Sequence, residues 1–386
     1  MSPHELPVMQ ELAAGLGAEN FRYVVSAGHS AERNALGWPD ERQSWLIQLD
    51  RDADRVAEAD QWIREADLAL FGDRDHPRIK WRVDRGRQTM YTSERWFKPP
   101  LGMLRLLNPP HLLRAQRLGR WMGSPAFHYL PIGIHAVRDE TRLRKLFAPA
   151  CGGNPMLLWG YFVSPSAPLP DLRRRAGPMR VLWAGRMLAL KRVDTLIQAV
   201  GALWQRGIDI RLSLVGEGAE EPRLRQLATR LTRKADDKTT GASAPWVSFH
   251  PPVPIGEVRQ WMRKSDVYVL PSNGYEGWGA VVNEAMLEGC AVIATCEAGS
   301  AATLIRDGHN GLLFRAGDVA ALTAALARLE ADEALRQRLA GAGQRTIWSH
   351  WAPDVAAQRL IAVSAALVAG CEPPMFAEGP LQQIPT

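Results

Sequence analysis

Two glutamates stand eight residues apart in the segment 276–294, Glu276 in a glycine-containing loop and Glu284 on a predicted helix that ends at Gly289. A buried strand is predicted to follow from Ala291. This arrangement presents backbone N–H groups and a helix N-terminus to a phosphate, while the two carboxylates can accept hydrogen bonds from sugar hydroxyls. The segment therefore favours the binding of a nucleotide-sugar.

Two cations precede this segment in the second half of the chain. Arg186 and Lys191 follow the apolar run 179–184, which predicts a strand. A chain that leaves a parallel strand emerges at the carboxyl edge of the sheet, where ligands usually bind. Two cations there can neutralise a diphosphate and stabilise it as a leaving group. Alternatively, Lys191 and Arg192 form a solvated helix start, although cations at that end oppose the helix macrodipole and so favour a nearby anion.

Short apolar runs and helical patterns alternate around these side chains. They predict strands at 179–184, 210–215, 246–249, 267–270 and 291–295 in the second half, and a helix at 6–16 with strands at 23–26, 45–49, 68–71 and 88–92 in the first. Such alternation indicates parallel, doubly wound sheets. The predicted fold class is α/β, with two Rossmann-like doubly wound parallel-sheet domains facing across a cleft.

The chain has 386 residues, more than one hydrophobic core usually organises. A segment rich in proline and small residues, 164–178, separates the two halves. We therefore expect an N-terminal acceptor-side domain at 1–170, a nucleotide-sugar-binding domain at 171–350, and a C-terminal helix and tail at 351–386 that packs back on the first domain. The first domain opens with a helix where a central strand is expected, so that strand is missing from this chain or is encoded by an upstream start.

The 276–294 segment resembles the signature of the retaining glycosyltransferases of the GT-B fold, specifically glycosyltransferase family 4 (glycosyl transferases group 1). The resemblance runs from Val181 to about Leu360 and includes the segment 185–191 and the turn 307–311. It implies that Glu276 contacts the donor sugar, that Glu284 contacts the ribose, and that Arg186 and Lys191 hold the diphosphate. It also implies a donor-binding loop whose members are Trp278, Gly279 and Ala280, with the last two offering backbone N–H groups.

The resemblance points to two further contacts. Val253, in a loop with three prolines, stands where such enzymes hold the nucleotide base. Glu94 follows a predicted strand of the first domain, where many members of the family carry a histidine near the reacting sugar. Glu94 either orients the acceptor as a catalytic residue or pairs with Arg95 or another local cation, and the sequence leaves both readings open.

One motif favours a different chemistry. Asp73-Arg74-Asp75 follows the apolar run 68–71, which is how the metal-binding aspartates of the other large glycosyltransferase fold are placed. A pair of aspartates one residue apart arises easily by chance, so the signal is weak. The second-domain pattern outweighs it, and we expect no essential metal and no cofactor other than the nucleoside-diphosphate sugar as co-substrate.

Positive charge is concentrated between residues 80 and 120, where Lys and Arg exceed Asp and Glu by eight, although the whole chain carries only +6. Residues 101–122 interleave leucines, methionines and Trp121 with arginines. This stretch is either an amphipathic segment that lies on an anionic membrane or a core-packed helix with arginines facing water. The sequence shows no spanning segment and no signal peptide. We expect a cytoplasmic protein, peripheral on the inner face of the cytoplasmic membrane, with no nucleic-acid partner.

Together these features predict a metal-independent retaining glycosyltransferase that transfers a sugar from a nucleoside-diphosphate sugar to a saccharide or lipid-linked acceptor in glycan or polysaccharide biosynthesis. Two alternatives remain open at this level. One is a non-catalytic binding protein that keeps a nucleotide-sugar fold. The other is a nucleotide-sugar epimerase or hydrolase of the same architecture.

Overall fold

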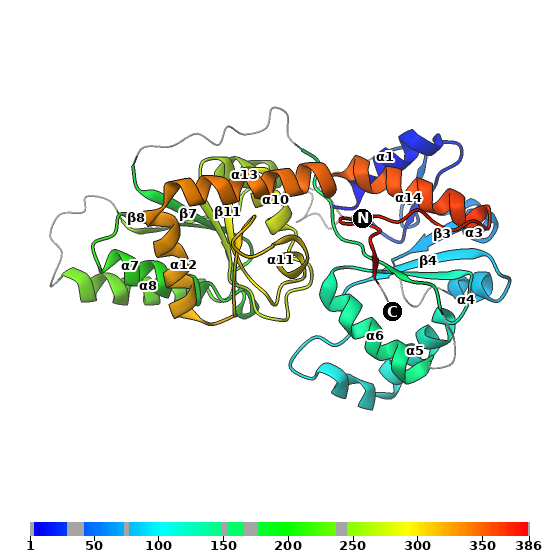
Figure 1. Ribbon diagram of the computed structural model, residues 1–386, viewed down its shortest axis with the longest axis horizontal. Helices are drawn as coiled ribbons and strands as arrows, with labels where there is room; N and C mark the ends of the chain where they lie inside the picture. Colours follow the sequence, from blue (N-terminus) through cyan, green and yellow to red (C-terminus); the bar gives the residue numbers. More distant parts are fainter. Residues whose placement is uncertain are drawn as a thin grey trace. The chain divides into compact units, whose positions relative to one another are not determined.

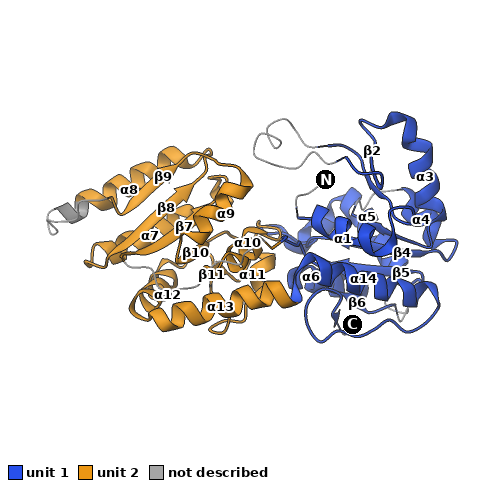
Figure 2. Cartoon of the chain, turned by 90° about the horizontal axis from the view of Figure 1, so that it is seen from above, with its two compact units in different colours: residues 1–34, 38–164, 350–386 blue, residues 35–37, 165–349 orange. Residues whose placement is uncertain are grey.

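The computed structural model describes residues 4–28, 42–72, 77–148, 153–165, 177–236 and 245–384. The chain divides into two compact units (Figure 2): unit 1 contains residues 1–34, 38–164 and 350–386, and unit 2 contains residues 35–37 and 165–349. Asp73 and Asp75 and most of the proline-rich segment lie outside the described residues.

Unit 2 alternates strands and helices along most of its length. Its strands are β7 (Met179–Ala184), β8 (Ile210–Val215), β9 (Val247–His250), β10 (Val267–Leu270), β11 (Ala291–Thr295) and β12 (Leu312–Phe314). Its helices are η3 (Ala189–Lys191), α7 (Val193–Trp204), α8 (Glu221–Asp236), α9 (Ile255–Arg263), α10 (Val281–Leu287), α11 (Gly299–Leu304), α12 (Val319–Ala331) and α13 (Glu333–His350, whose last residue belongs to unit 1). The predicted strands of this half are confirmed, whereas β12 was not predicted.

The strands of unit 2 form one parallel sheet in the order β12-β11-β10-β7-β8-β9. The chain starts in the middle with β7, extends to β9 on one side and then to β12 on the other, which is the doubly wound order. Helices α7 and α12 bury their apolar residues against this sheet in one large core (Figure 1). Burying these strands explains why their sequences read as short continuous apolar runs.

The loops at the carboxyl ends of β7 and β8 approach each other closely. Gly185 donates its N–H to the carbonyl of Val215 at 3.0 Å, and Gly216 donates to the carbonyl of His250 at 3.0 Å. Gly216 has φ +128°, and a Cβ there would lie 2.0 Å from the carbonyl oxygen of Gly185. Only glycine fits this position, so the backbone at the carboxyl edge is fixed by its own packing.

Unit 1 contains shorter elements. Its strands are β1 (Tyr23–Val25), β2 (Leu46–Gln48), β3 (Leu68–Phe71), β4 (Gln88–Ser93), β5 (Phe127–Pro131), β6 (Met156–Leu157) and β13 (Gln383–Ile384). Its helices are α1 (Leu6–Leu16), η1 (Ala53–Arg55), α3 (Val56–Glu65), α4 (Pro77–Val83), η2 (Gly102–Leu107), α5 (Pro109–Met122), α6 (Ile134–Phe147) and α14 (Pro353–Val368). The predicted helix 6–16 and the four predicted strands of this half are present, whereas β5 was not predicted.

The parallel strands of unit 1 fall into two sheets, β1-β2 and β3-β4-β5. A further small antiparallel pair joins β13 to β6. Helix α14 runs beside α1 (Figure 1), so the C-terminal residues pack within unit 1. The mixed α/β class with parallel sheets agrees with the prediction.

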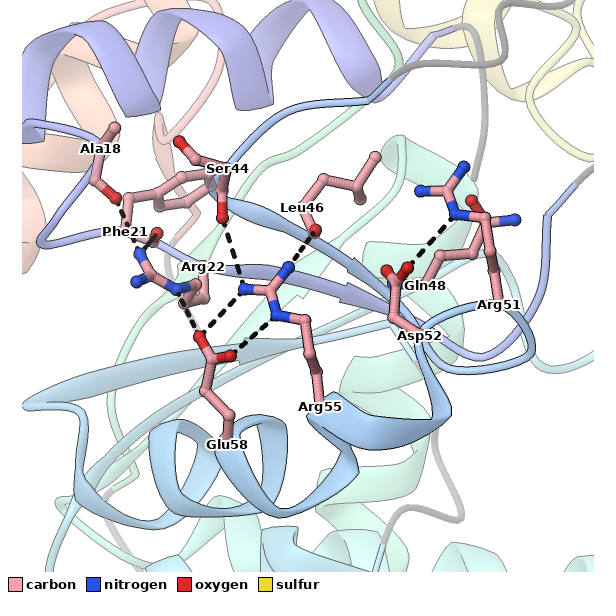
Figure 3. A network of polar contacts seen from close by, with 10 residues as sticks. All are labelled: Ala18, Phe21, Arg22, Ser44, Leu46, Gln48, Arg51, Asp52, Arg55 and Glu58. Carbon is pink, nitrogen blue, oxygen red and sulfur yellow. Dashed lines mark hydrogen bonds and ion pairs between the residues drawn. The ribbon is translucent and has the colours of Figure 1, made fainter.

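Polar contacts attach α3 to the β1-β2 sheet (Figure 3). Glu58 on α3 accepts a hydrogen bond from Arg22 Nε at 3.2 Å and two from Arg55, at 2.8 Å from Nε and 3.0 Å from Nη2. Arg55 also donates to the carbonyls of Leu46 at 3.2 Å and Ser44 at 3.4 Å. The hydrogen bonds from Arg55, followed by those from Arg22, lower the pKa of Glu58 to about 2. This network ties the helix that leads into β3 to the residues around β1 and β2.

Candidate active site

The predicted donor-site residues of unit 2 follow the carboxyl ends of its parallel strands. Arg186 and Lys191 follow β7, Val253 follows β9, and Glu276 follows β10. These loops leave the same edge of the sheet. The loops after β7 and β10 lie at its centre, where the winding direction changes, whereas β9 is the outermost strand. Such an edge is where doubly wound sheets bind ligands.

The loop after β7 exposes one cation and holds the other. Arg186 is exposed, whereas Lys191 ends the short helix η3 and is half-buried. Arg192, the next residue, adopts the left-handed conformation with φ 47° and ψ 39°. A residue with a Cβ pays a cost of roughly 1 kcal/mol or more for this conformation. Arg192 is the C-cap of η3 and the N-cap of α7, so this conformation turns the chain from one helix into the next.

Lys191 and Glu276, 85 positions apart in the chain, form an ion pair. Lys191 Nζ donates to Glu276 Oε2 at 2.5 Å, and their side chains are 20% and 12% exposed. The backbones of the two loops are also joined, because Asn273 donates its N–H to the carbonyl of Leu190 at 2.9 Å. Glu276 donates its own N–H to the Asn273 carbonyl at 2.9 Å. The structure thus places a cation and a carboxylate together at the predicted ligand edge.

Glu284 lies on α10, and the buried Tyr268 lies at the same edge of the sheet. Glu284 is 5% exposed. Tyr268, on β10, is fully buried and donates its hydroxyl to the carbonyl of Ala184 at 3.2 Å, where β7 ends. Burial raises the pKa of Tyr268 far above its usual value, and the charges of Glu284 and Glu276 raise it further. Tyr268 is therefore a neutral donor beside both glutamates.

The loop between Glu276 and α10 is held by α11. The N–H of Gly299 donates to the carbonyl of Gly277 at 3.0 Å, and the N–H of Ser300 donates to that of Trp278 at 2.8 Å. The Ser300 hydroxyl donates to the Gly279 carbonyl at 2.9 Å. With its carbonyls engaged, the loop cannot rotate freely, and its N–H groups keep one orientation.

Gly279 and Ala280 stand directly before α10. Gly279 has φ +81°, a left-handed conformation that glycine adopts without strain. Ala280 is the N-cap residue, and it provides no side-chain cap. Among the described residues, the N–H groups of these two positions have no protein acceptor, as is usual for a first helical turn. They are available to an anion.

Trp278 has a different environment from the one that a ligand contact requires. Its side chain is 1% exposed, and its indole N–H donates to Asn283 Oδ1 on α10 at 2.8 Å. The ring therefore packs in the interior and supports the loop from behind. The side chain of Trp278 presents no surface to a donor in this arrangement.

The turn 307–311 is built from internal hydrogen bonds. Asn310, 2% exposed, donates to the Leu304 carbonyl at 2.9 Å and to Thr346 Oγ1 at 3.0 Å. Its oxygen accepts the N–H of Arg306 at 2.7 Å. Asp307 Oδ1 accepts the N–H of Leu313 at 2.8 Å. The residue types in this turn are thus explained by closing it onto α13.

The remaining predicted residues are not joined to the Lys191–Glu276 pair. Val253 is half-buried in the loop after β9. Among the residues that the structure describes, Arg186 forms no ion pair. Glu94 belongs to unit 1, where it accepts a hydrogen bond from Lys98 at 2.8 Å. Glu94 therefore pairs with a local cation, which is Lys98.

Three contributors to the site were not predicted from the sequence. Tyr268 lies in a run of apolar residues, and the sequence does not distinguish it from a tyrosine that only packs in the core. Ser300, through its N–H and its hydroxyl, and Asn273, through its N–H, join segments that are distant in sequence. Position was a signal for Asn273, which lies three residues after the predicted strand 267–270.

Comparisons with known proteins match the second half of the chain to glycosyltransferases. Residues 178–332 match the model of a family described as glycosyl transferases group 1. The D-inositol 3-phosphate glycosyltransferase of Nocardioides sp. is 35% identical over 169 residues, which cover 42% of this chain and 36% of that one. The lipopolysaccharide core biosynthesis glycosyltransferase LpsE of Rhizobium meliloti is 32% identical over 167 residues, 43% of this chain and 44% of that one. The chain thus spans less than half the length of these curated relatives.

Solved structures match over nearly the whole chain. The HepE protein of Anabaena, solved in complex with UDP, gives a TM-score of 0.62 at 17% identity, covering 95% of this chain and 97% of that one. Sucrose-phosphate synthase from Thermosynechococcus elongatus gives a TM-score of 0.61 at 18% identity, covering 94% and 92%. These likenesses show the fold, which is GT-B.

Proposed function

Because residues 178–332 form a group 1 glycosyltransferase domain and the chain has the GT-B fold, we propose that this protein transfers a sugar from a nucleoside-diphosphate sugar to a saccharide or lipid-linked acceptor. The reaction would serve the synthesis of a glycan or polysaccharide. The observation that carries the proposal is the Lys191–Glu276 pair at the carboxyl edge of the unit 2 sheet.

In this proposal the bound donor breaks the ion pair between Lys191 and Glu276. Lys191 and Arg186 then bind the diphosphate, together with the N–H groups of Gly279 and Ala280. Glu276, released from Lys191, accepts hydrogen bonds from the sugar hydroxyls, and Glu284 accepts them from the ribose. The ion pair keeps both side chains in place and their charges balanced until the donor arrives.

The chemical step requires stabilisation of the departing diphosphate. Lys191 and Arg186 supply positive charge where negative charge grows as the bond from the anomeric carbon to the phosphate oxygen breaks. The acceptor oxygen then attacks the anomeric carbon from the face that the diphosphate leaves, so the configuration is retained. The proton of the acceptor hydroxyl passes to the leaving diphosphate. Both the retaining outcome and independence from metal are parts of the proposal. Glu94, which pairs with Lys98, is proposed to contact the acceptor in addition.

The test is a thermal-shift screen of nucleoside diphosphates, followed by turnover of the matching donor sugars with saccharide and lipid-linked acceptors in EDTA. A ligand at 100 times its Kd raises the free energy of unfolding by about 2.7 kcal/mol, which is readily measured. We expect one base to stabilise the protein and its sugar to be transferred without added metal. Loss of turnover in EDTA would contradict the metal-independent mechanism. Release of free sugar at a rate that does not depend on the acceptor would favour a hydrolase.

We also propose that residues 101–122 dock unit 1 on an anionic membrane, at the inner face of the cytoplasmic membrane. On and around η2, Leu104 is 61% and Leu107 is 80% exposed. Leu101, Met103 and Leu113 are also exposed, while Arg117 and Arg120 of α5 face solvent. The opposite face of α5 packs in the core. Within the described residues, no helix combines the length and the apolar character needed to cross a bilayer.

Flotation with vesicles tests this surface. We expect the protein to float with vesicles that contain phosphatidylglycerol and to float much less with phosphatidylcholine alone, because arginines near a surface contribute roughly 1 kcal/mol each. The double variant Leu104→Glu/Leu107→Glu should lose most of this recovery. The matched control, Val368→Glu/Met375→Glu, changes two exposed apolar residues elsewhere in unit 1 and should float normally. Equal recovery with both kinds of vesicle would contradict the proposal.

A further inference from the structure

A small pocket of unit 1 lies between α5 and the segment that follows β4. It is lined by Tyr91, Trp96, Arg114, Arg117, Leu118 and Trp121. The pocket has room for roughly one water molecule, so a larger group would sit at its mouth. Arg117 is exposed and Arg114 is half-buried. A ligand that approaches from solvent would therefore meet guanidinium groups first.

The charge around this pocket favours an anion. Arg114 and Arg117 are three residues apart on α5, so their side chains share one face of the helix. Like charges this close on a helix are unfavourable, and a bound anion would relieve them. From residue 101 to residue 122 the chain contains four arginines and no aspartate or glutamate. On η2, the buried Nε of Arg105 has no hydrogen-bond acceptor among the described residues. Donors therefore exceed acceptors on this surface.

The surface on one side of the pocket is apolar. Helix η2 leads directly into α5, because Asn108 is the C-cap of η2 and the N-cap of α5. On and around η2, Leu101, Leu104 and Leu107 are 53%, 61% and 80% exposed. Guanidinium groups bind phosphate with two parallel hydrogen bonds, whereas exposed leucines bind hydrocarbon. Together they fit an amphiphile with a phosphate group better than a free phosphate ion, which would not use the leucines.

On its other side the pocket adjoins the proposed acceptor contact. Trp96, which lines the pocket, stands two residues after Glu94, so their Cα atoms are at most about 7 Å apart. Lys98 donates to Glu94 at 2.8 Å, and the Lys98 carbonyl accepts the N–H of Gly102 at 3.2 Å. Gly102 is the first residue of η2. One short segment, 94–102, thus runs from the acceptor contact past the pocket to the apolar turn.

This segment is attached to the same helix that supports α5. The N–H of Phe97 donates to Asp139 Oδ2 on α6 at 2.8 Å, and Arg95 Nε lies 3.6 Å from the same oxygen. Asp139 is 1% exposed. Before the segment, Ser93 Oγ lies 2.6 Å from the hydroxyl oxygen of Tyr129 on β5. Helix α5 also packs against α6 (Figure 1). Both walls of the pocket are therefore held by one helix.

From this arrangement we infer that the pocket binds the phosphate of a lipid-linked acceptor, whose sugar reaches Glu94. Arg114 and Arg117 bind the phosphate oxygens, and the lipid chain lies along Leu104 and Leu107. The inference rests on the proposed function and deepens it, because it selects a saccharide carried on a lipid phosphate over a soluble saccharide. It also differs from general attraction to an anionic membrane, because it assigns the two arginines to one bound phosphate.

Calorimetric titration with water-soluble probes tests the pocket without any reaction. The probes are octyl phosphate, octyl glucoside and inorganic phosphate, which carry both, only the chain and only the charge. We expect octyl phosphate to bind at least about tenfold more tightly than the other two. Arg117→Gln and Arg114→Gln should each weaken it about tenfold or more, the usual effect of losing a hydrogen bond to a charged group. The matched control, Arg138→Gln, removes an exposed arginine of α6 outside the pocket and should bind normally.

Turnover shows whether the pocket serves the acceptor. The acceptor is a hexose joined to a long-chain alkyl phosphate, presented in phosphatidylcholine vesicles, which have no net charge that could attract the arginines. We expect Arg117→Gln to raise the KM for this acceptor about tenfold, because it loses one charge-assisted contact. The kcat, the KM for the donor and the melting temperature should change little. The alkyl hexoside without phosphate should be a poor acceptor for both the wild type and the variant.

The possible results separate the two proposals. Equal affinity of the wild type and both arginine variants for octyl phosphate would overturn the phosphate site. Inorganic phosphate that binds as tightly as octyl phosphate would overturn its assignment to a lipid, and so would equal transfer to the hexoside without phosphate. Tight binding of octyl phosphate without transfer to any acceptor would contradict the proposed function while supporting the phosphate site.

Discussion

Replacing Lys191 with alanine is expected to lower donor turnover by about 100- to 1,000-fold at saturating donor, the usual cost of removing one group that stabilises developing negative charge. The same change should weaken donor binding, because Glu276 would be left beside the diphosphate without the cation 2.5 Å away. The melting temperature should also fall, because the two side chains are only 20% and 12% exposed and Glu276 loses this cation. Steady-state kinetics and a melting curve of each variant give the measurement.

Two further variants provide a control and test whether the Lys191–Glu276 pair only holds the loops together. Lys264→Ala removes an exposed lysine of unit 2 and should leave turnover unchanged. If the ion pair only braces the loops, the double variant Lys191→Ala/Glu276→Gln should recover turnover, because no charge is left unpaired. In the proposed mechanism it should be as slow as Lys191→Ala or slower. Normal turnover of Lys191→Ala with saturating donor would refute the assignment.

Replacing Glu288 with alanine is expected to lower the free energy of unfolding by about 3 kcal/mol, the lower part of the range for breaking a buried ion pair. Glu288 follows α10 with a side chain that is 1% exposed. Its two oxygens accept hydrogen bonds from Arg259 and Arg263 on α9, at 2.5 Å each. Both arginines would lose this carboxylate, and α9 would lose these contacts with the residue that follows α10.

Calorimetric melting checks this expectation. For a unit of this size, 3 kcal/mol corresponds to a drop of roughly 6 to 12 °C. Glu257→Ala, an exposed carboxylate on α9, is the matched control and should shift the melting temperature by at most about 2 °C. A shift of Glu288→Ala no larger than that of the control would show that the arginines find equivalent partners in solvent.

The sequence located most strands of unit 2 because they are largely apolar, and β10 and β11 are buried along their whole length. The predictions 179–184, 210–215, 267–270 and 291–295 coincide with β7, β8, β10 and β11. Strand β5 was missed because it contains His128 and ends at Pro131, residue types that do not signal a strand. His128 is tolerated there since its Nε2 is 2.9 Å from Gln88 Oε1 on β4.

By itself the sequence determined the fold class, the alternation of strands and helices, and the presence of cations and carboxylates after successive strands. Those features depend on local periodicity and on residue type, which the chain displays directly. The tertiary structure alone decided which of these groups meet. In the tertiary structure Lys191 pairs with Glu276, Glu288 pairs with two arginines, and the side chain of Trp278 is buried. Such contacts join positions 25 or more residues apart in most cases, and they follow from sheet order and loop packing, which no local pattern encodes.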